Sequence, residues 1–104
     1  MAIKTKPKKS TSSIKNKFSK DTYVKWYKDM LLIRKFEEKT GQLYIQQKFG
    51  GFCHLHIGQE AIVVGTASAC ESGDKHMTAY RDHAHPIALG TDPRVLMAEL
   101  YGRK

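Results

Sequence analysis

Apolar side chains recur every three or four residues in the stretch that follows residue 20. The positions that share this spacing are Tyr23, Val24, Tyr27, Met30, Leu31, Leu32, Phe36 and Leu43. Such spacing, with charged residues between the apolar ones, predicts an amphipathic helix. Ser19 or Asp21 can accept hydrogen bonds from the free N–H groups of its first turn. We therefore predict a helix from about residue 21 to 40 that runs past Gly41 to about residue 47.

Glycines divide the middle of the chain into shorter segments. Gly50 and Gly51 end the helical pattern, because glycine permits backbone angles that other residues avoid. An extended or irregular segment, residues 52–57, follows. The run of small apolar residues over 61–70 predicts a second helix that is buried and closely packed. Residues 75–80 predict a short strand.

Two prolines mark the remaining helical segments. Pro86 can begin a short helical turn over residues 86–89. Residues 91–93, Thr-Asp-Pro, are a strong helix start, since an N-cap candidate precedes a proline in the first helical position. That helix is expected to end near residue 101. The residues on its expected buried face are Val95, Leu96 and Leu100. The chain after residue 20 is thus predicted to be mostly helical, with at most one or two short strands.

The positive charge of the chain is concentrated in its first twenty residues. The 104 residues carry a net charge of +8, and residues 1–20 hold seven lysines and no acid. Residues 21–104 hold eleven Lys and Arg against ten Asp and Glu, so they present no basic face for nucleic acid. We predict that residues 1–20 form a disordered basic tail. A solvated extension is the favoured role of this tail. A docking segment for an acidic partner, an organelle transit peptide and, last, nucleic-acid binding stay open.

No stretch of the sequence is long and apolar enough to be a membrane span. The longest apolar run, residues 61–70, is far shorter than the roughly 20 residues that a span needs. No apolar segment follows the lysines as a secretory signal requires. Two cysteines make no disulfide framework, which favours a reducing compartment. We expect no membrane partner and a bacterial cytoplasmic location, with the mitochondrial matrix as the less favoured alternative.

Four of the five histidines form two His-x-His pairs, His54 with His56 and His83 with His85. Alternate residues of an extended segment share a face, so each pair can present two imidazoles to one metal ion. No third ligand accompanies them at a fixed spacing. Separate polar or buried roles are therefore the favoured interpretation, and we predict no metal ligands in this chain.

A second polar cluster is the run of Tyr80, Arg81, Asp82 and His83. The forked donors of an arginine, with a neighbouring tyrosine hydroxyl, suit a phosphate or another anion. Asp82 can orient either His83 or Arg81. Elsewhere in the chain, Arg34 lies among apolar neighbours and is expected to pair with a carboxylate.

Four segments of the chain together resemble a known enzyme family. They are Met30-Leu31-Leu32-Ile33-Arg34-Lys35-Phe36-Glu37-Glu38-Lys39, Gly51-Phe52-Cys53-His54-Leu55, Gly58-Gln59-Glu60-Ala61 and Tyr80-Arg81-Asp82-His83. In this order they resemble the N-terminal part of the α subunit of the pyruvate dehydrogenase E1 component. This family consists of thiamine-diphosphate-dependent 2-oxoacid dehydrogenases. Residues 21–104 are therefore expected to be the N-terminal part of an E1 α domain, truncated because the family continues beyond residue 104.

The resemblance implies an α/β fold for a full subunit, the thiamine-diphosphate-binding fold with a parallel sheet between flanking helices. It also implies the oxidative decarboxylation of pyruvate, with transfer of the acetyl group to the lipoyl group of the E2 acyltransferase. The implied partners are an E1 β subunit in an α2β2 heterotetramer, the lipoyl-bearing E2 and pyruvate. The fragment alone is expected to be inactive.

The resemblance also assigns roles to single residues. Tyr80 and Arg81 become the candidate ligands of the diphosphate of thiamine diphosphate. His54 becomes a candidate catalytic residue near the reacting centre, and His83 a second one that supports the same site. The Mg²⁺ ligands of the family, in a Gly-Asp-Gly…Asn segment, are expected beyond residue 104.

Three further positions bear on these assignments. His56 stands where relatives often have Tyr or Cys, which changes the wall of the site. Gln59 and Glu60 are expected to cap a helix. The alternative functions are the E1 α subunit of a related 2-oxoacid or acetoin dehydrogenase, a small non-catalytic partner-binding module, and a His-rich metal protein.

Overall fold

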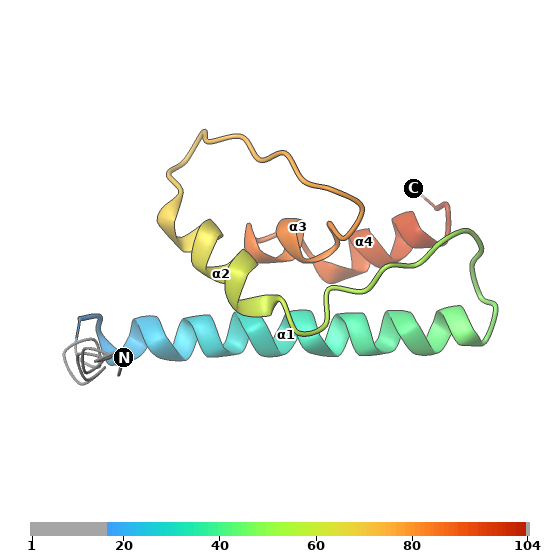
Figure 1. The fold of residues 1–104 in the computed structure, drawn as a ribbon, viewed down its shortest axis with the longest axis horizontal. Coiled ribbons are helices and arrows are strands. Elements are labelled where there is room, and N and C mark those ends of the chain that lie inside the picture. The colour runs from blue at the N-terminus through green and yellow to red at the C-terminus, as the bar shows by residue number, and fades with distance from the viewer. Residues whose placement is uncertain (1–16, 104) are drawn as a thin grey trace, which may run out of the picture.

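The computed structural model describes residues 17–103. This part of the chain contains four helices and no strand: α1 (Lys20–Ile45), α2 (Glu60–Ala69), α3 (Ala84–Ala88) and α4 (Pro93–Leu100). The three short helices lie on one side of the long helix α1 (Figure 1). The mostly helical character is thus confirmed. The predicted disordered tail lies outside the described residues as far as residue 16, and its last residue, Lys20, is already helical.

The long helix begins and ends close to the predicted residues. The Ser19 hydroxyl accepts a hydrogen bond from the N–H of Thr22 at 3.2 Å, so Ser19 is the N-cap. Gly41 lies inside the helix, as predicted. A methyl group at Gly41 would stand 3.1 Å from Cδ1 of Leu55, so the glycine lets the segment after the helix approach closely. Beyond the helix, Gln47 adopts a positive φ of 57° as the chain turns back.

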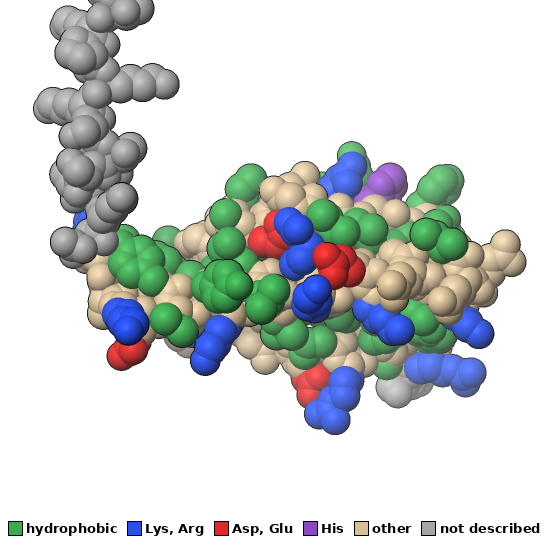
Figure 2. Space-filling model, turned by 90° about the horizontal axis from the view of Figure 1, so that it is seen from below, with side chains coloured by type: hydrophobic (Ala, Val, Ile, Leu, Met, Phe, Trp, Pro, Cys, Tyr) green, Lys and Arg blue, Asp and Glu red, His purple; other side chains and the backbone are tan. Residues whose placement is uncertain are grey.

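The buried face of α1 agrees with the predicted apolar stripe only in part, through Phe36. The buried side chains of α1 are those of Ile33, Phe36, Glu37 and Thr40. Val24, Tyr27 and Leu31, which belong to the predicted apolar stripe, are 41%, 64% and 43% exposed. Figure 2, which views the molecule from the side of α1, shows apolar side chains exposed on this face. Glu37 and Thr40 on the packed face are polar, so the spacing of apolar residues did not indicate that this face is buried.

The hydrophobic core lies between α1 and the three short helices. Its buried members are Ile33, Phe36, Val63, Val64, Ala84, Ile87 and Leu96. The indole N–H of Trp26 donates to the Ser68 hydroxyl at 2.6 Å and joins the start of α1 to the end of α2.

Among the described residues, no helix combines the length and the apolar character that a membrane crossing needs.

Two predictions for the middle of the chain need correction. The second helix exists, but only one of its faces is buried, through Val63 and Val64, while Ile62 is 70% exposed. Residues 75–80 form an irregular part of the loop between α2 and α3. A strand needs a neighbour to accept and donate its backbone hydrogen bonds. The part of the chain that the structure describes offers no such neighbour.

The last two helices follow their start signals. α3 begins at Ala84, two residues before the predicted turn, and ends at Ala88, one residue before the predicted end. The helix predicted over residues 93–101 is confirmed as α4: the Asp92 carboxylate accepts the N–H of Arg94 at 2.9 Å. Leu96 is buried as predicted, but Val95 is 60% exposed, so the predicted face of α4 is only partly correct.

The corrected face of α1 makes a testable prediction. Ile33→Ala should lower the free energy of unfolding by about 2–5 kcal/mol, because it leaves a cavity among buried side chains. Leu31→Ala, two residues earlier on the outer face, should cost less than about 1 kcal/mol. Urea unfolding of the two variants of the full chain measures both values. Equal losses would contradict the assignment of the buried face.

Candidate cofactor-binding site

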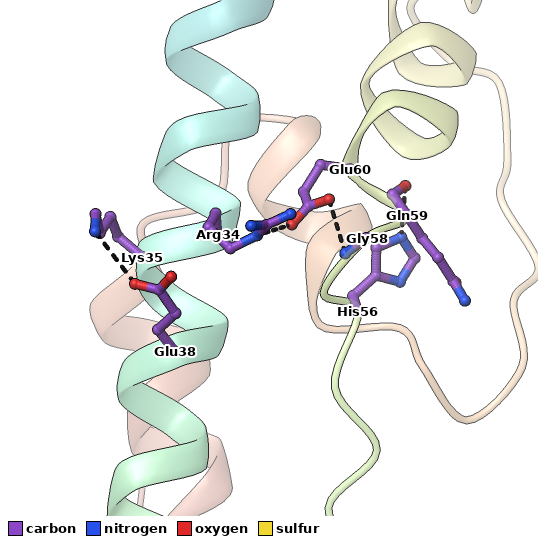
Figure 3. A network of polar contacts seen from close by, with 7 residues as sticks. All are labelled: Arg34, Lys35, Glu38, His56, Gly58, Gln59 and Glu60. Atoms are coloured by element: carbon purple, nitrogen blue, oxygen red, sulfur yellow. Dashed lines mark hydrogen bonds and ion pairs between the residues drawn. The ribbon is translucent and has the colours of Figure 1, made fainter.

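An ion pair ties the start of α2 to the middle of α1 (Figure 3). Nε of Arg34 donates to Oε1 of Glu60 at 2.5 Å, which confirms the expected carboxylate partner of Arg34. The second oxygen of Glu60 accepts the backbone N–H of Gly58 at 3.0 Å. The hydrogen bond from Arg34 holds the pKa of Glu60 below its ordinary value of 4.5, so the carboxylate is charged at neutral pH.

The helix-capping roles predicted for Gln59 and Glu60 are only partly correct. Gln59 is the N-cap residue of α2, but its side chain makes no capping hydrogen bond. The Glu60 carboxylate instead turns back to Gly58 and across to Arg34. Its main effect is therefore to fix the turn before α2 and its place against α1.

A buried histidine connects this turn to the loop before α3. His56 is only 5% exposed. Its Nδ1 lies 2.8 Å from the carbonyl oxygen of Arg81, and its Nε2 lies 3.2 Å from that of Gln59. In return, Nη1 of Arg81 donates to the carbonyl of Leu55 at 3.0 Å. Residues 55 and 56 thus hold Arg81 by both its backbone carbonyl and its side chain.

Three of the four predicted site residues come together where these segments meet. The rings of His54 and Tyr80 have their centroids 4.7 Å apart. Cζ of Arg81 lies 5.7 Å from the centroid of the Tyr80 ring. The Phe52 ring is nearly parallel to that of His54, with a centroid distance of 6.3 Å. His54, Tyr80 and Arg81 are all exposed, so the cluster lies at the surface of the described chain.

The chemistry of this cluster suits an anionic ligand. A guanidinium has five N–H donors, and the bond to Leu55 uses one of those on Arg81. The remaining donors, together with the hydroxyl of Tyr80, can bind phosphate oxygens. Burial, with the nearby charge of Glu37, raises the pKa of the Cys53 thiol above its ordinary value of 9.0. Cys53 therefore stays protonated at neutral pH and is not poised as a nucleophile.

The fourth predicted site residue, His83, turns toward α1. Its Nδ1 lies 3.2 Å from Oε1 of Glu37, and its ring stands edge-on to Phe36 at 6.4 Å. The hydrogen bond to Glu37 raises the pKa of His83 above its ordinary value of 6.5, although burial opposes the shift. Sequence reasoning missed Glu37. The signal was its place one residue after Phe36 and four after Ile33, on the face that the core covers.

The His-x-His pairs do not act as pairs. His54 lies beside Tyr80, while His56 is buried between two carbonyls. His83 faces Glu37, and burial lowers the pKa of His85 below 6.5. Residues 17–103 contain no group of three or more His, Cys, Asp or Glu side chains that could hold a metal ion. The described residues thus give no support to the alternative of a His-rich metal protein.

Comparison with known proteins identifies the class. The family model of the dehydrogenase E1 component matches residues 28–104, and the chain belongs to this family. The pyruvate dehydrogenase E1 component subunit alpha of Rickettsia prowazekii is 57% identical over 84 residues, which are 81% of this chain and 26% of the relative. The subunit of the same name from Rhizobium meliloti is 58% identical over 87 residues, 84% of this chain and 25% of the relative. The chain spans about a quarter of the length of these curated relatives.

The contact between Glu37 and His83 makes a testable prediction. Glu37→Gln keeps the shape of the side chain and removes its charge, so the pKa of His83 should fall. NMR titration of His83 in the full chain measures this change. Because the folded pKa is raised, the stabilising contribution is complete below pH 6.5 and is lost as pH rises through the folded pKa of His83. Stability above pH 6.5 should therefore fall less steeply in the variant, and an unchanged pKa would contradict the assignment.

Proposed function

We propose that this chain supplies the diphosphate-binding wall of a pyruvate dehydrogenase E1 α subunit. The observation that carries the proposal is the exposed cluster of Tyr80 and Arg81 beside His54, held by hydrogen bonds between two loops. Membership of the dehydrogenase E1 family, which depends on thiamine diphosphate, supports it. So do the names of the two relatives from Rickettsia prowazekii and Rhizobium meliloti.

In this proposal the residues of the chain bind and orient the cofactor. Arg81 offsets the negative charge of the diphosphate, and Tyr80 donates a further hydrogen bond. Bound thiamine diphosphate supplies the electron sink that a 2-oxoacid needs for decarboxylation. His54 lies next to Tyr80 and can donate a proton or a hydrogen bond to the reacting oxygen. His83, whose pKa is raised by its hydrogen bond to Glu37, connects the loop that carries Arg81 to α1.

The rest of such a site must come from elsewhere. In this proposal the Mg²⁺ ligands lie beyond residue 104, as the resemblance to the family implies. We expect an E1 β subunit in an α2β2 heterotetramer, transfer of the acetyl group to lipoyl-bearing E2, pyruvate as the substrate, and a bacterial cytoplasmic location. The full subunit would have the α/β fold with a parallel sheet between flanking helices. Residues 1–104 alone are expected to be inactive.

A hybrid enzyme tests the role of Arg81. Residues 28–104 of this chain replace the matching segment of the Rhizobium meliloti subunit, which is co-expressed with the β subunit of the same enzyme. Arg81→Ala in this hybrid should raise the Kd for thiamine diphosphate roughly 10- to 100-fold, the range expected for a lost charge-assisted hydrogen bond. Turnover of pyruvate at saturating cofactor should change far less, because the lost contact is to the diphosphate and not to the reacting atoms.

Arg94→Ala is the matched control for this experiment. Arg94 is also an exposed arginine, and its bond to Asp92 lies at the start of α4. The control should leave the Kd for thiamine diphosphate unchanged. An unchanged Kd in Arg81→Ala would overturn the cofactor assignment. A hybrid that assembles and prefers branched 2-oxoacids or acetoin would retain the assignment and replace pyruvate as the substrate.

A further inference from the structure

His56 is a buried polar side chain that the proposed chemistry does not use. It is 5% exposed, and both ring nitrogens face backbone carbonyls rather than solvent or the cluster of Tyr80 and His54. A buried polar ring without a function in binding is costly unless its hydrogen bonds stabilise something. The two carbonyls belong to Arg81 and Gln59, in segments far apart in the sequence.

The distances indicate which carbonyl His56 serves. A neutral imidazole has one N–H and one lone pair, so it can donate to only one of the two carbonyls. The contact of Nδ1 with the Arg81 carbonyl is 2.8 Å, whereas that of Nε2 with Gln59 is 3.2 Å. The shorter contact favours the tautomer that carries the N–H on Nδ1, in which His56 donates to the Arg81 carbonyl.

Arg81 lies in a segment with little other support. Residues 70–83 contain no helix or strand, so the ladders that hold most backbones in place are missing from this described segment. His56 holds the carbonyl of Arg81, and the Leu55 carbonyl holds its guanidinium. These two bonds fix Arg81 at both its backbone and its side chain. Their partners, Leu55 and His56, are adjacent residues of the segment before α2.

We propose that His56 is a positioning residue for Arg81. By donating from Nδ1 to the Arg81 carbonyl, it holds the guanidinium where the diphosphate binds, and so sets the affinity for the cofactor. This inference rests on the proposed function, because it requires Arg81 to bind the diphosphate. It adds to that function a residue that touches neither cofactor nor substrate.

The protonation of the ring is measured on the full chain of 104 residues. Two-bond ¹⁵N–¹H NMR correlations distinguish a nitrogen that carries a proton from one that does not. The proposal requires an N–H at Nδ1 of His56. A ring protonated at Nε2 alone would overturn it, whether or not the chain binds any cofactor.

The effect on binding is measured in the hybrid enzyme described above. His56→Phe keeps a ring and removes both nitrogens, so the Kd for thiamine diphosphate should rise roughly 5- to 20-fold. Turnover at saturating cofactor should stay within about twofold. His56→Asn places an amide N–H as many bonds from Cα as Nδ1 and should restore the Kd to within about threefold. His56→Gln places its amide at the distance of Nε2, toward Gln59, and should not restore it.

The order of the variants separates positioning from packing. A role in packing alone would leave no reason for Asn, the smaller side chain, to restore binding better than Gln. Equal Kd values for Asn and Gln would therefore overturn the proposal, even where the Phe variant fails to fold. His76→Asn, in the loop and outside the site, is the control that should match the unsubstituted hybrid. An unchanged Kd in His56→Phe alone overturns this inference, whereas an unchanged Kd in Arg81→Ala overturns the proposed function and this inference with it.

Discussion

The ion pair between Arg34 and Glu60 is the contact on which the geometry of the site depends. Glu60 is the first residue of α2 and is 5% exposed, so its charge must be neutralised where it lies. Arg34, from the middle of α1, supplies the opposite charge. The second oxygen of Glu60 holds the N–H of Gly58, whose φ of +91° suits glycine and turns the chain into the helix. His56 precedes this turn, and its ring then reaches Arg81. One buried carboxylate thereby fixes a series of contacts from α1 to the candidate cofactor-binding loop.

Local signals in the sequence were sufficient for the helices and insufficient for their faces. Ser19 and Asp92 marked the helix starts, because capping depends only on residues three or fewer positions away. The buried face of α1 depends on what packs against it. Glu37 lies on that face, where it pairs with His83, a residue 46 positions later in the chain. The spacing of apolar residues within α1 carries no information about that partner. The strand predicted over residues 75–80 was wrong for the same reason, since pairing requires a distant neighbour.

The candidate site was predicted in part. Its residues His54, Tyr80 and Arg81 were predicted from motifs. In the structure they are neighbours through ring contacts, which the sequence alone does not reveal. His56, which contacts the Arg81 carbonyl, and Glu60, which fixes the turn before α2, are ordinary polar residues in the sequence. Their role becomes visible only when burial and backbone partners are known. Phe52 and Met77, 95% and 99% exposed, lie in the same loops. Their exposure suits a surface that other parts of an assembled enzyme cover, as the proposed function requires.

The most direct measurement is an experimental structure of the assembled hybrid enzyme with thiamine diphosphate bound. The account predicts diphosphate oxygens within hydrogen-bond distance of the Tyr80 hydroxyl and the Arg81 guanidinium. It also predicts that the contacts of Arg34 with Glu60 and of His56 with the Arg81 carbonyl persist. A diphosphate held away from Arg81, or an Arg81 backbone released from His56 in the bound state, would contradict it.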